Sequence, residues 1–195
     1  VLRNKSTTHP LQILGSGLGT LVQEMTMHMG GVQVEKIPFY NRTEALLQRL
    51  MPWIKRIQLY DEQLGYGSGT MRGDDFISAE IPASGSREIL WRPLASGLCS
   101  QRNFIPTAFI SQGVTLELNL VTDPTEVCDT AADHSTDYEL LSVKVLVDSI
   151  SVDPAFLTSM SRHLLNNGSL TLHPKQYQTV QYSVNSPSMQ LVSAR

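Results

Sequence analysis

Two short motifs contain residue types that catalysis or ligand binding uses. Residues 15–19 (GSGLG) follow an apolar run, as a dinucleotide-binding loop does, but their spacing is GxGxG and not GxGxxG. Asp129, Asp133 and Asp137 lie four residues apart around His134, a carboxylate density that suits Ca²⁺, yet the spacing and the glycine of an EF-hand loop are missing. We therefore expect no cofactor loop in the first motif and a solvated connection between strands in the second.

The histidines and cysteines do not suggest a reactive centre either. The five histidines form neither an HxH nor an HExxH pattern, and Cys99 and Cys128 are far apart without a CxxC pair. Both cysteines are expected to be reduced and structural. Nothing local selects a catalytic carboxylate pair or a Ser-His-Asp set. The sequence thus predicts no catalytic residue, no cofactor and no metal, and therefore no enzyme.

The composition narrows the class of protein further. Of the 195 residues, 17% are charged and 15 are Lys or Arg, which gives a formal net charge of −3. Such a chain lacks the basic excess that binding of a phosphate backbone needs, so we expect no direct binding of nucleic acid. No run approaches the roughly 18 apolar residues of a membrane span. With 41% hydrophobic residues, the chain is long enough for one sizeable core.

Short apolar runs bounded by Gly, Pro, Asp or Ser predict a chain of many strands. The clearest is residues 114–122, where Leu116, Leu118 and Leu120 alternate with polar residues and are expected on one core face. In the strand predicted at 138–148, three valines with the same alternation should point into that core: Val143, Val145 and Val147. The other predicted strands are residues 32–37, 54–60, 76–81, 87–92, 105–110, 170–172 and 176–184.

Two short helices complete the prediction. Residues 45–51 have a helical pattern that Pro52 ends. In the second helix Asp153 is an acidic cap, Pro154 occupies the first turn, and the segment at Gly168 ends it. Without βαβ alternation, these elements predict an all-β fold: a jelly-roll β-sandwich of two antiparallel sheets with one or two short helices. Residues 1–31 are expected to form a poorly defined N-terminal arm, and residues 32–184 the jelly-roll domain.

Between residues 91 and 106 the sequence alternates backbone-fixing residues with large apolar ones. The residues expected to fix the backbone path between strands are Pro93, Gly97 and Pro106. Those expected to supply buried area are Trp91, Leu94, Leu98 and Phe104. We refer to residues 91–106 as the anchor segment, and expect it to be structural.

The anchor segment resembles a stretch of the double jelly-roll major capsid proteins, in which a Pro-Leu-x-Ser-Gly-Leu turn precedes a Tyr/Phe-Ile/Leu-Pro step and a Leu-Glu-Leu strand. Here the order is PLASGL, FIP and LELNL. A second block, residues 143–170, is similar to the strand, Asp-led helix and Leu-Leu-x-x-Gly-x-Leu element that closes the first jelly roll in Polinton-like viruses and adintoviruses. Leu164, Leu165 and Gly168 match that element, whereas Thr171 replaces the usual Pro.

This resemblance implies a structural protein. The chain would be the first of two jelly rolls, with residues 185–195 as a linker towards the second. The complete protein would form a trimeric, pseudo-hexameric capsomer of an icosahedral DNA virus shell, assembled in the host cell interior and located in the virion. Its expected partners are two further copies, neighbouring capsomers and penton proteins. A surface with little charge and many Ser, Thr, Asn and Gln residues suits such a subunit.

Two alternatives share the all-β fold. A carbohydrate-binding, lectin-like jelly roll should present aromatic residues on one sheet face or loop rim. The candidate aromatics are instead spread along the sequence: Trp53, Tyr60, Tyr66, Trp91 and Tyr177. A β-sandwich hydrolase should contain a clustered carboxylate pair, which the sequence does not indicate.

Overall fold

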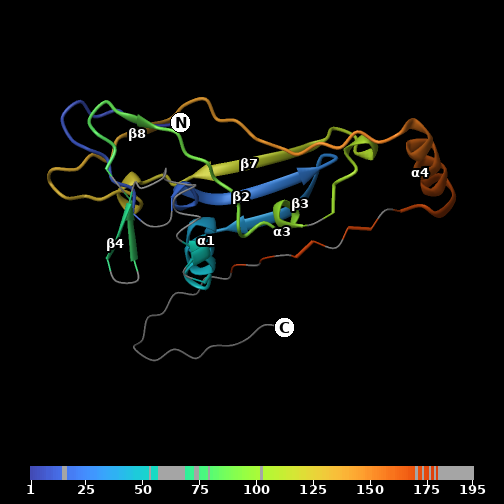
Figure 1. The fold of residues 1–195 in the computed structure, drawn as a ribbon, viewed down its shortest axis with the longest axis horizontal. Helices are drawn as coiled ribbons and strands as arrows, with labels where there is room; N and C mark the ends of the chain where they lie inside the picture. Colours follow the sequence, from blue (N-terminus) through green and yellow to red (C-terminus); the bar gives the residue numbers. More distant parts are fainter. Residues whose placement is uncertain are drawn as a thin grey trace.

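The computed structural model of the protein describes residues 1–14, 17–52, 54–56, 69–72, 75–78, 80–101, 103–169, 171–172, 174–175, 177 and 179. Its strands form two three-stranded antiparallel sheets and a separate two-stranded hairpin (Figure 1). The helices of the described residues are few and short. The predicted all-β, jelly-roll-like fold is therefore confirmed.

The first sheet has the strand order β6-β1-β8. Its middle strand, β1 (Leu2–Asn4), pairs with β6 (Ser86–Arg87) on one side and with β8 (Tyr138–Leu140) on the other. The side chains of Leu2 and Asn4 are buried, as alternation along a half-buried strand requires. Leu2 belongs to a core cluster whose other buried members are Leu11, Ile13, Leu21, Ile81, Val121, Val127 and Cys128.

The second sheet has the order β3-β2-β7. β2 (Val22–Met29) and β3 (Val32–Pro38) form a hairpin, and β2 also pairs with β7 (Val114–Leu120). Gly30 and Gly31 form the hairpin turn with φ of 61° and 80°, values that glycine adopts without steric strain. A second core cluster lies on this sheet and contains Val22, Met25, Ile37, Tyr40 and Ala95.

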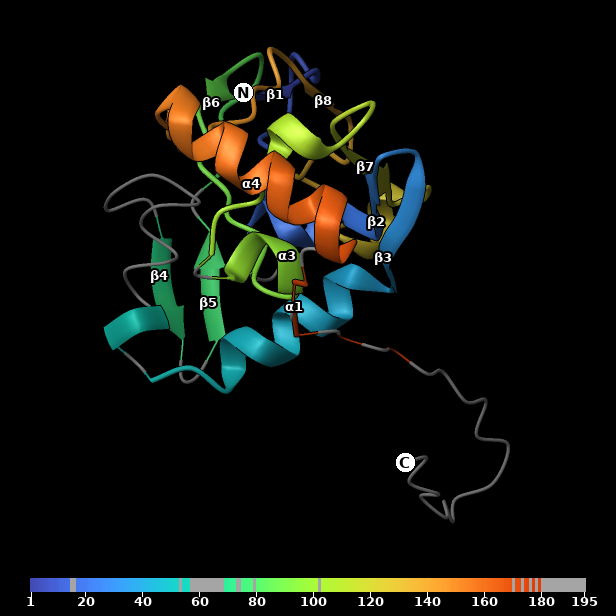
Figure 2. The ribbon, with the colours of Figure 1, turned by 90° about the vertical axis from the view of Figure 1, so that its right-hand side faces the viewer.

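The remaining elements lie around these sheets. β4 (Gly69–Arg72) and β5 (Asp75–Ser78) form the separate hairpin. The helices are α1 (Tyr40–Arg49), α3 (Gly97–Ser100) and α4 (Pro154–Asn167), and there are 3₁₀ turns at Leu18–Leu21, Thr107–Phe109 and Pro124–Glu126. Figure 1 shows α4 at the end of the molecule opposite the hairpin, and Figure 2 views the molecule from the α4 side.

Both predicted helices are present. α1 begins earlier than predicted, at Tyr40, and its last residue, Arg49, lies before Pro52. α4 begins as predicted: an Asp153 side-chain oxygen accepts a hydrogen bond from the Ala155 backbone N–H, and proline occupies the first turn. Gly168 ends α4 with a φ of 87°, the left-handed conformation typical of a helix C-terminus. The predicted boundaries of α4 are therefore confirmed.

Residues 1–31 do not form the expected arm. They contribute the middle strand of each sheet, β1 and β2, and several of the most buried side chains, including Leu11 and Met25. The sequence pattern does not indicate that role, because one of the buried residues, Asn4, is polar. Its Nδ2 atom donates to the carbonyl oxygens of His9 and Ile81, at 2.8 and 3.2 Å. A buried strand position is usually apolar, but here it holds an amide whose hydrogen bonds to the backbone satisfy its polar group.

The prediction for Val143, Val145 and Val147 is wrong. β8 ends at Leu140, and Ser142 has a φ of 49°, so the extended backbone is interrupted there. The three valine side chains are 70, 71 and 78% exposed. No strand of the described residues pairs with this segment, so it belongs to no sheet that could hold its valine side chains against the core.

Other predicted strands are absent or shorter. Residues 105–110 contain a 3₁₀ turn, residues 54–56 are helical, and only Arg87 of the strand predicted at 87–92 is paired. Of the strands predicted at 170–172 and 176–184, the described residues are 171, 172, 177 and 179, and none of these is in a strand. The residues predicted as a linker, 185–195, lie outside the described part of the chain, as do residues 57–60.

Candidate functional site

The anchor segment packs against α1 and the β3-β2-β7 sheet through Trp91. The indole ring lies edge-on to Tyr40, with centroids 5.8 Å apart and planes at 87°. Its Nε1 atom donates a hydrogen bond of 2.9 Å to Oε1 of Glu44. Leu98 is buried, and Pro93 and Leu94 are half-buried. These residues therefore contribute to the packing of the anchor segment against the rest of the molecule.

Other predicted anchors contribute less buried area than expected. Phe104 is 59% exposed, so the prediction that it supplies core area is wrong, and Pro106 is half-buried. A turn near Thr107 replaces the strand that would have held the Phe104 ring against the sheet. On α4, Leu164 is half-buried and Leu165 is 87% exposed, because consecutive helical residues point about 100° apart.

The leucines of β7 behave as predicted at two positions out of three. Leu116 and Leu118 are half-buried and pack against the core cluster on the sheet. Leu120, the last residue of the strand, is 41% exposed, and its successor Val121 is buried in the other core cluster. At the end of β7 the inward-facing position is therefore Val121 and not Leu120.

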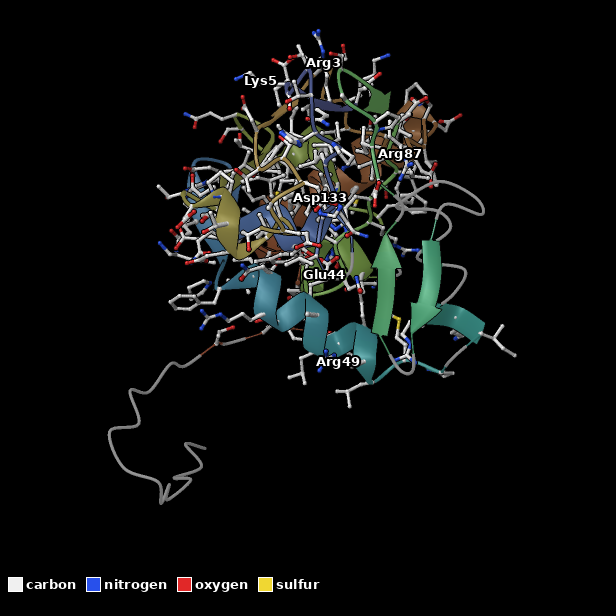
Figure 3. The ribbon with its side chains drawn as sticks, turned by 90° about the vertical axis from the view of Figure 1, so that its left-hand side faces the viewer. Arg3, Lys5, Glu44, Arg49, Arg87 and Asp133 are labelled. Atoms are coloured by element: carbon white, nitrogen blue, oxygen red, sulfur yellow. The ribbon has the colours of Figure 1, made fainter. Side chains whose placement is uncertain are left out.

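A buried polar cluster that the sequence did not predict connects α1 to the anchor segment. We call Tyr40, Glu44, Gln48 and Trp91 the Glu44 cluster. Glu44 and Gln48 lie one helical turn apart, and Nε2 of Gln48 donates to Oε1 of Glu44 at 3.2 Å. Figure 3 shows Glu44 on the part of α1 that adjoins the sheets and Arg49 at the far end of the helix. Polar residues at helical spacing are usually solvated, so their burial could not be predicted from the sequence.

Burial perturbs both titratable groups of this cluster. It raises the pKa of Glu44 above 4.5, although hydrogen bonds from neighbouring side chains oppose the shift. Burial and the adjacent Glu44 carboxylate raise the pKa of Tyr40 as well. A carboxyl with a raised pKa is a common feature of acid-base catalysis, but structural polar networks produce the same shift. Here all partners of Glu44 belong to the packing between α1 and the anchor segment.

A second buried carboxylate, Glu35, fixes the start of α3. Its Oε2 accepts from Oγ of Ser96 and its Oε1 from the backbone N–H of Gly97, both at 2.8 Å. Ser96 Oγ in turn accepts from the Cys99 backbone N–H at 3.1 Å and so caps the helix. The backbone of Lys175 passes so close to Gly97 that a Cβ atom there would collide with it. Both carboxylate oxygens of Glu35 therefore accept hydrogen bonds that fix the start of α3.

The chain after α4 returns across the same face of the sheet. Tyr177 packs against the core cluster that contains Tyr40, and the Thr179 and Thr43 hydroxyls lie 2.9 Å apart. An open cavity of about 470 Å³ lies beside Glu35. Its lining combines Glu35 and Lys175 with Met29, Val34, Leu98, Leu172 and Pro174. Of the candidate sugar-binding aromatics, Trp91 and Tyr177 are thus packed inward, and Trp53, Tyr60 and Tyr66 lie outside the described residues.

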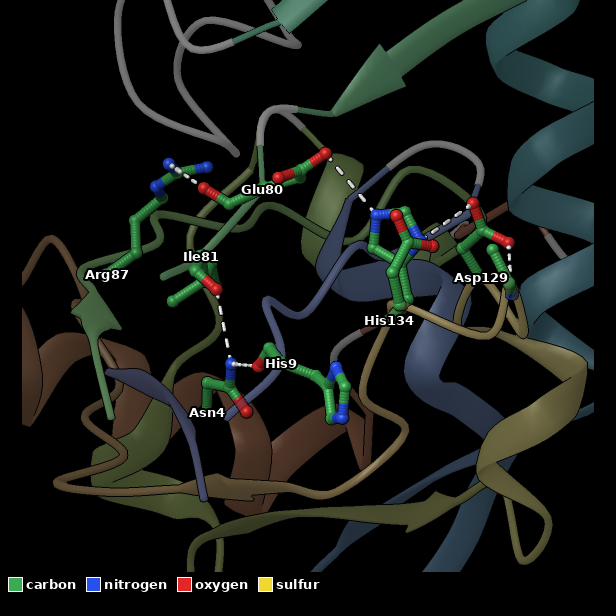
Figure 4. A network of polar contacts seen from close by, with 9 residues as sticks. Asn4, His9, Glu80, Ile81, Arg87, Asp129 and His134 are labelled. Carbon is green, nitrogen blue, oxygen red and sulfur yellow. Dashed lines mark hydrogen bonds and ion pairs between the residues drawn. The ribbon is translucent and has the colours of Figure 1, made fainter. Parts of the chain in front are cut away.

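The acidic segment around His134 forms a polar network near the first sheet (Figure 4). The imidazole lies 3.3 Å from Glu80, 3.4 Å from Asp133 and 3.6 Å from Asp129. Asp137 is not part of this group, because it pairs with Lys5 at 3.1 Å. Among the described residues, no group of three or more His, Cys, Asp or Glu side chains is arranged to hold a metal ion.

Both cysteines are free, and their thiols are poor nucleophiles at neutral pH. Burial raises the pKa of Cys128 to about 11 and also raises the pKa of Cys99. At pH 7 both side chains therefore carry their proton, and neither resembles an activated cysteine.

The most unusual surface is the connection from β8 to α4. Residues 143–152, which we call the apolar segment, are all exposed and run along the upper outline of the molecule in Figure 1. The segment contains six exposed aliphatic side chains: Val143, Val145, Leu146, Val147, Ile150 and Val152. Soluble monomers rarely expose continuous apolar patches of this kind unless another molecule covers them. The described residues thus contain a candidate association surface, which sequence alternation identified as core.

Comparison with known proteins gives no independent identification. No protein-family model, no curated protein and no solved structure matches the chain. In the described part of the chain, none of the helices has the length and apolar character that crossing a membrane requires.

Proposed function

We propose that this chain is the first jelly roll of a double jelly-roll major capsid protein, which forms trimeric capsomers of an icosahedral DNA virus shell. The observation that carries the proposal is the exposed apolar segment on an all-β, jelly-roll-like fold. Shell subunits need such surfaces because each copy must associate with others while its own core holds the fold. The two sequence blocks that resemble the capsid family, residues 91–121 and 143–170, support the same function.

The buried carboxylates are consistent with a scaffold role in this proposal. Glu44 holds α1 to Trp91, and Glu35 holds β3 to Ser96 and Gly97. Each contact joins segments that lie far apart in sequence and thereby stabilises the fold. The inward packing of Trp91 and Tyr177 favours this function over carbohydrate binding, which requires aromatic faces open to solvent.

Sedimentation measurements on two polypeptides test the proposal. The first is this chain, and the second is a polypeptide in which a second strand-rich domain follows it. We expect the longer protein to form trimers and this chain to form at most weak assemblies, because a stable obligate interface buries roughly 2,000 Å² or more. A longer protein that stays monomeric and binds sugars would contradict the proposal and favour the lectin-like alternative.

A pair of substitutions, one inside the apolar segment and one outside it, tests whether this segment takes part in assembly. Val147→Ser in the longer protein should weaken its assembly, whereas Leu50→Ser, just after the end of α1, should not. Both side chains are exposed to a similar degree, 78 and 73%, so neither change should unfold the chain. Equal assembly of the two variants would argue against the apolar segment as the association surface.

A further inference from the structure

Residues 143–149 belong to no helix, strand or turn and have no partner strand in the described part of the chain. Among the described residues, none pairs with this stretch in a sheet or forms a hydrogen bond with it. The last residue tied to the body of the molecule is Leu141, which exchanges two backbone hydrogen bonds with Val1, at 2.7 and 2.8 Å. At the other end, Asp153 begins α4. The stretch is thus fixed at both ends and open between them.

The sequence of this stretch, VKVLVDS, is complementary to itself in the antiparallel direction. When two copies are aligned about Leu146, the leucine lies opposite its own equivalent. Lys144 then lies opposite Asp148, and Val145 opposite Val147, each pair occurring twice because the arrangement is two-fold symmetric. Opposite charges and β-branched residues at directly opposed positions are the cross-strand pairs that stabilise antiparallel strands.

The two faces of such a ribbon differ. Side chains alternate between faces, so Val143, Val145 and Val147 lie on one face, and the corresponding valines of the second copy lie on the same face. The other face carries Leu146 between Lys144 and Asp148. The first face is therefore apolar except at its two ends, where Ser149 lies opposite Val143 of the other copy, and the second face has its charges neutralised in pairs. A shift of the alignment by one residue would place valines opposite charges and lose both ion pairs.

We propose that two copies of this chain associate through antiparallel pairing of residues 143–149, with a two-fold axis at Leu146. The partner is a second copy because the charge pattern of the stretch is complementary to its own sequence. A contact of seven residues on each side falls among small interfaces, below about 1,200 Å², so the dimer is weak and depends on concentration. This inference rests on the segment and not on the capsid function, although it would supply a two-fold contact between capsomers.

Charge reversal tests the pairing. In sedimentation equilibrium of this chain at up to about 100 µM, a range suited to weak interfaces, we expect reversible dimers. Lys144→Asp should raise the dissociation constant about tenfold or more, because both cross-strand ion pairs become repulsive. The double variant Lys144→Asp/Asp148→Lys should restore dimers, because the symmetric pairing regains both ion pairs. All these side chains are exposed, so the fold should tolerate the changes.

Disulfide trapping tests the register. In a Cys99→Ser background, Leu146→Cys should form a covalent dimer under mild oxidation, since directly opposed residues have the Cα separation that a disulfide needs. Ile150→Cys is the matched control, because its two equivalents would lie about 27 Å apart in this register. Residue 150 is likewise exposed.

Three results would overturn the inference. They are a chain that stays monomeric at every concentration, a double variant no better than Lys144→Asp, and an Ile150→Cys variant that crosslinks as readily as Leu146→Cys. A monomeric chain whose segment becomes protected from hydrogen exchange only in a longer polypeptide would identify another domain as the occupant. Trimer formation by the longer protein is measured separately, so the capsid proposal can fail or succeed independently of this dimer.

Discussion

Replacing Trp91 with alanine should destabilise the protein without removing any reactive group. The substitution deletes three interactions that the structure places on one side chain. These are the edge-on contact with Tyr40, the hydrogen bond to Glu44, and the apolar area that the half-buried indole covers. Each contribution has a known order of magnitude, so the total loss can be estimated before the experiment.

An aromatic pair contributes about 0.5–1.5 kcal/mol beyond its buried area. Loss of a donor to a buried acceptor costs about 1–3 kcal/mol. Half of an indole area of about 200 Å², at about 25 cal/mol per Å², adds roughly 2–3 kcal/mol. These contributions overlap, and together they indicate a loss of about 3–5 kcal/mol, the range typical of Trp→Ala substitution in a core. That is a large fraction of the roughly 5–15 kcal/mol by which a domain is stable.

Equilibrium unfolding in urea, followed by circular dichroism, measures this loss. Trp91→Phe is the matched variant: it keeps an aromatic ring against Tyr40 but has no N–H to donate to Glu44. We expect Trp91→Phe to lose about 1–3 kcal/mol, the value of the missing hydrogen bond, and thus less than Trp91→Ala. The slope of the unfolding free energy with urea should stay unchanged, because both variants unfold from a similar native state.

A Trp91→Ala variant within about 0.5 kcal/mol of the original protein would refute the reasoning, because that is the range of ordinary surface substitutions. It would mean that the indole neither anchors α1 nor satisfies the buried carboxylate. Glu44→Gln in both backgrounds then separates the two contributions, since a double-mutant cycle isolates the coupling between Trp91 and Glu44.

Burial raises the pKa of Glu44, so the carboxyl of the folded chain binds its proton more tightly than that of the unfolded chain. The free energy of unfolding should therefore fall as pH rises from about 4.5 through the folded pKa. The fall should be at most about 1.4 kcal/mol per pH unit. Glu44→Gln should remove this component, and identical pH profiles of the two proteins in urea unfolding would contradict the assignment. Ser96→Ala should cost about 1–3 kcal/mol, because it deprives buried Glu35 of a donor and α3 of its cap, whereas the exposed Ser86→Ala should be neutral in the same denaturation assay. Asp153→Ala should speed hydrogen exchange of the α4 amides, since the cap contributes about 1 kcal/mol, and Asp153→Asn should not; equal exchange in both variants would speak against the cap.

Features encoded by neighbouring residues were predictable from the sequence. The boundaries of α4 follow from Asp153, Pro154 and Gly168, which act within one turn of the helix end. The orientation of Leu116 and Leu118 follows from alternation within a single strand. In both cases the physical cause lies within a few residues of its effect.

Features that depend on distant partners were not predictable in this way. In β3 the apolar residues Val32 and Val34 are exposed, while Glu35 is buried. Glu35 faces the same side of β3 as the buried Ile37, two residues later, and Ser96 and Gly97 satisfy its carboxylate. Likewise, the alternation of Val143, Val145 and Val147 indicates an apolar face but does not identify what covers it. Glu44 and Tyr40 remained undetected for the same reason.

The position of β1 has a consequence for how the chain folds. It is the middle strand of its sheet, yet its two partners, at Arg87 and Leu140, appear much later in the sequence. When this part of the chain is synthesised from its N-terminal side, Leu2–Asn4 must wait for Arg87 before one edge can be paired and for Leu140 before the other can. Closing such long loops is entropically unfavourable and slow, so folding should be completed late and at a modest rate. During that delay the unpaired strand is a point at which nascent chains are vulnerable to mispairing.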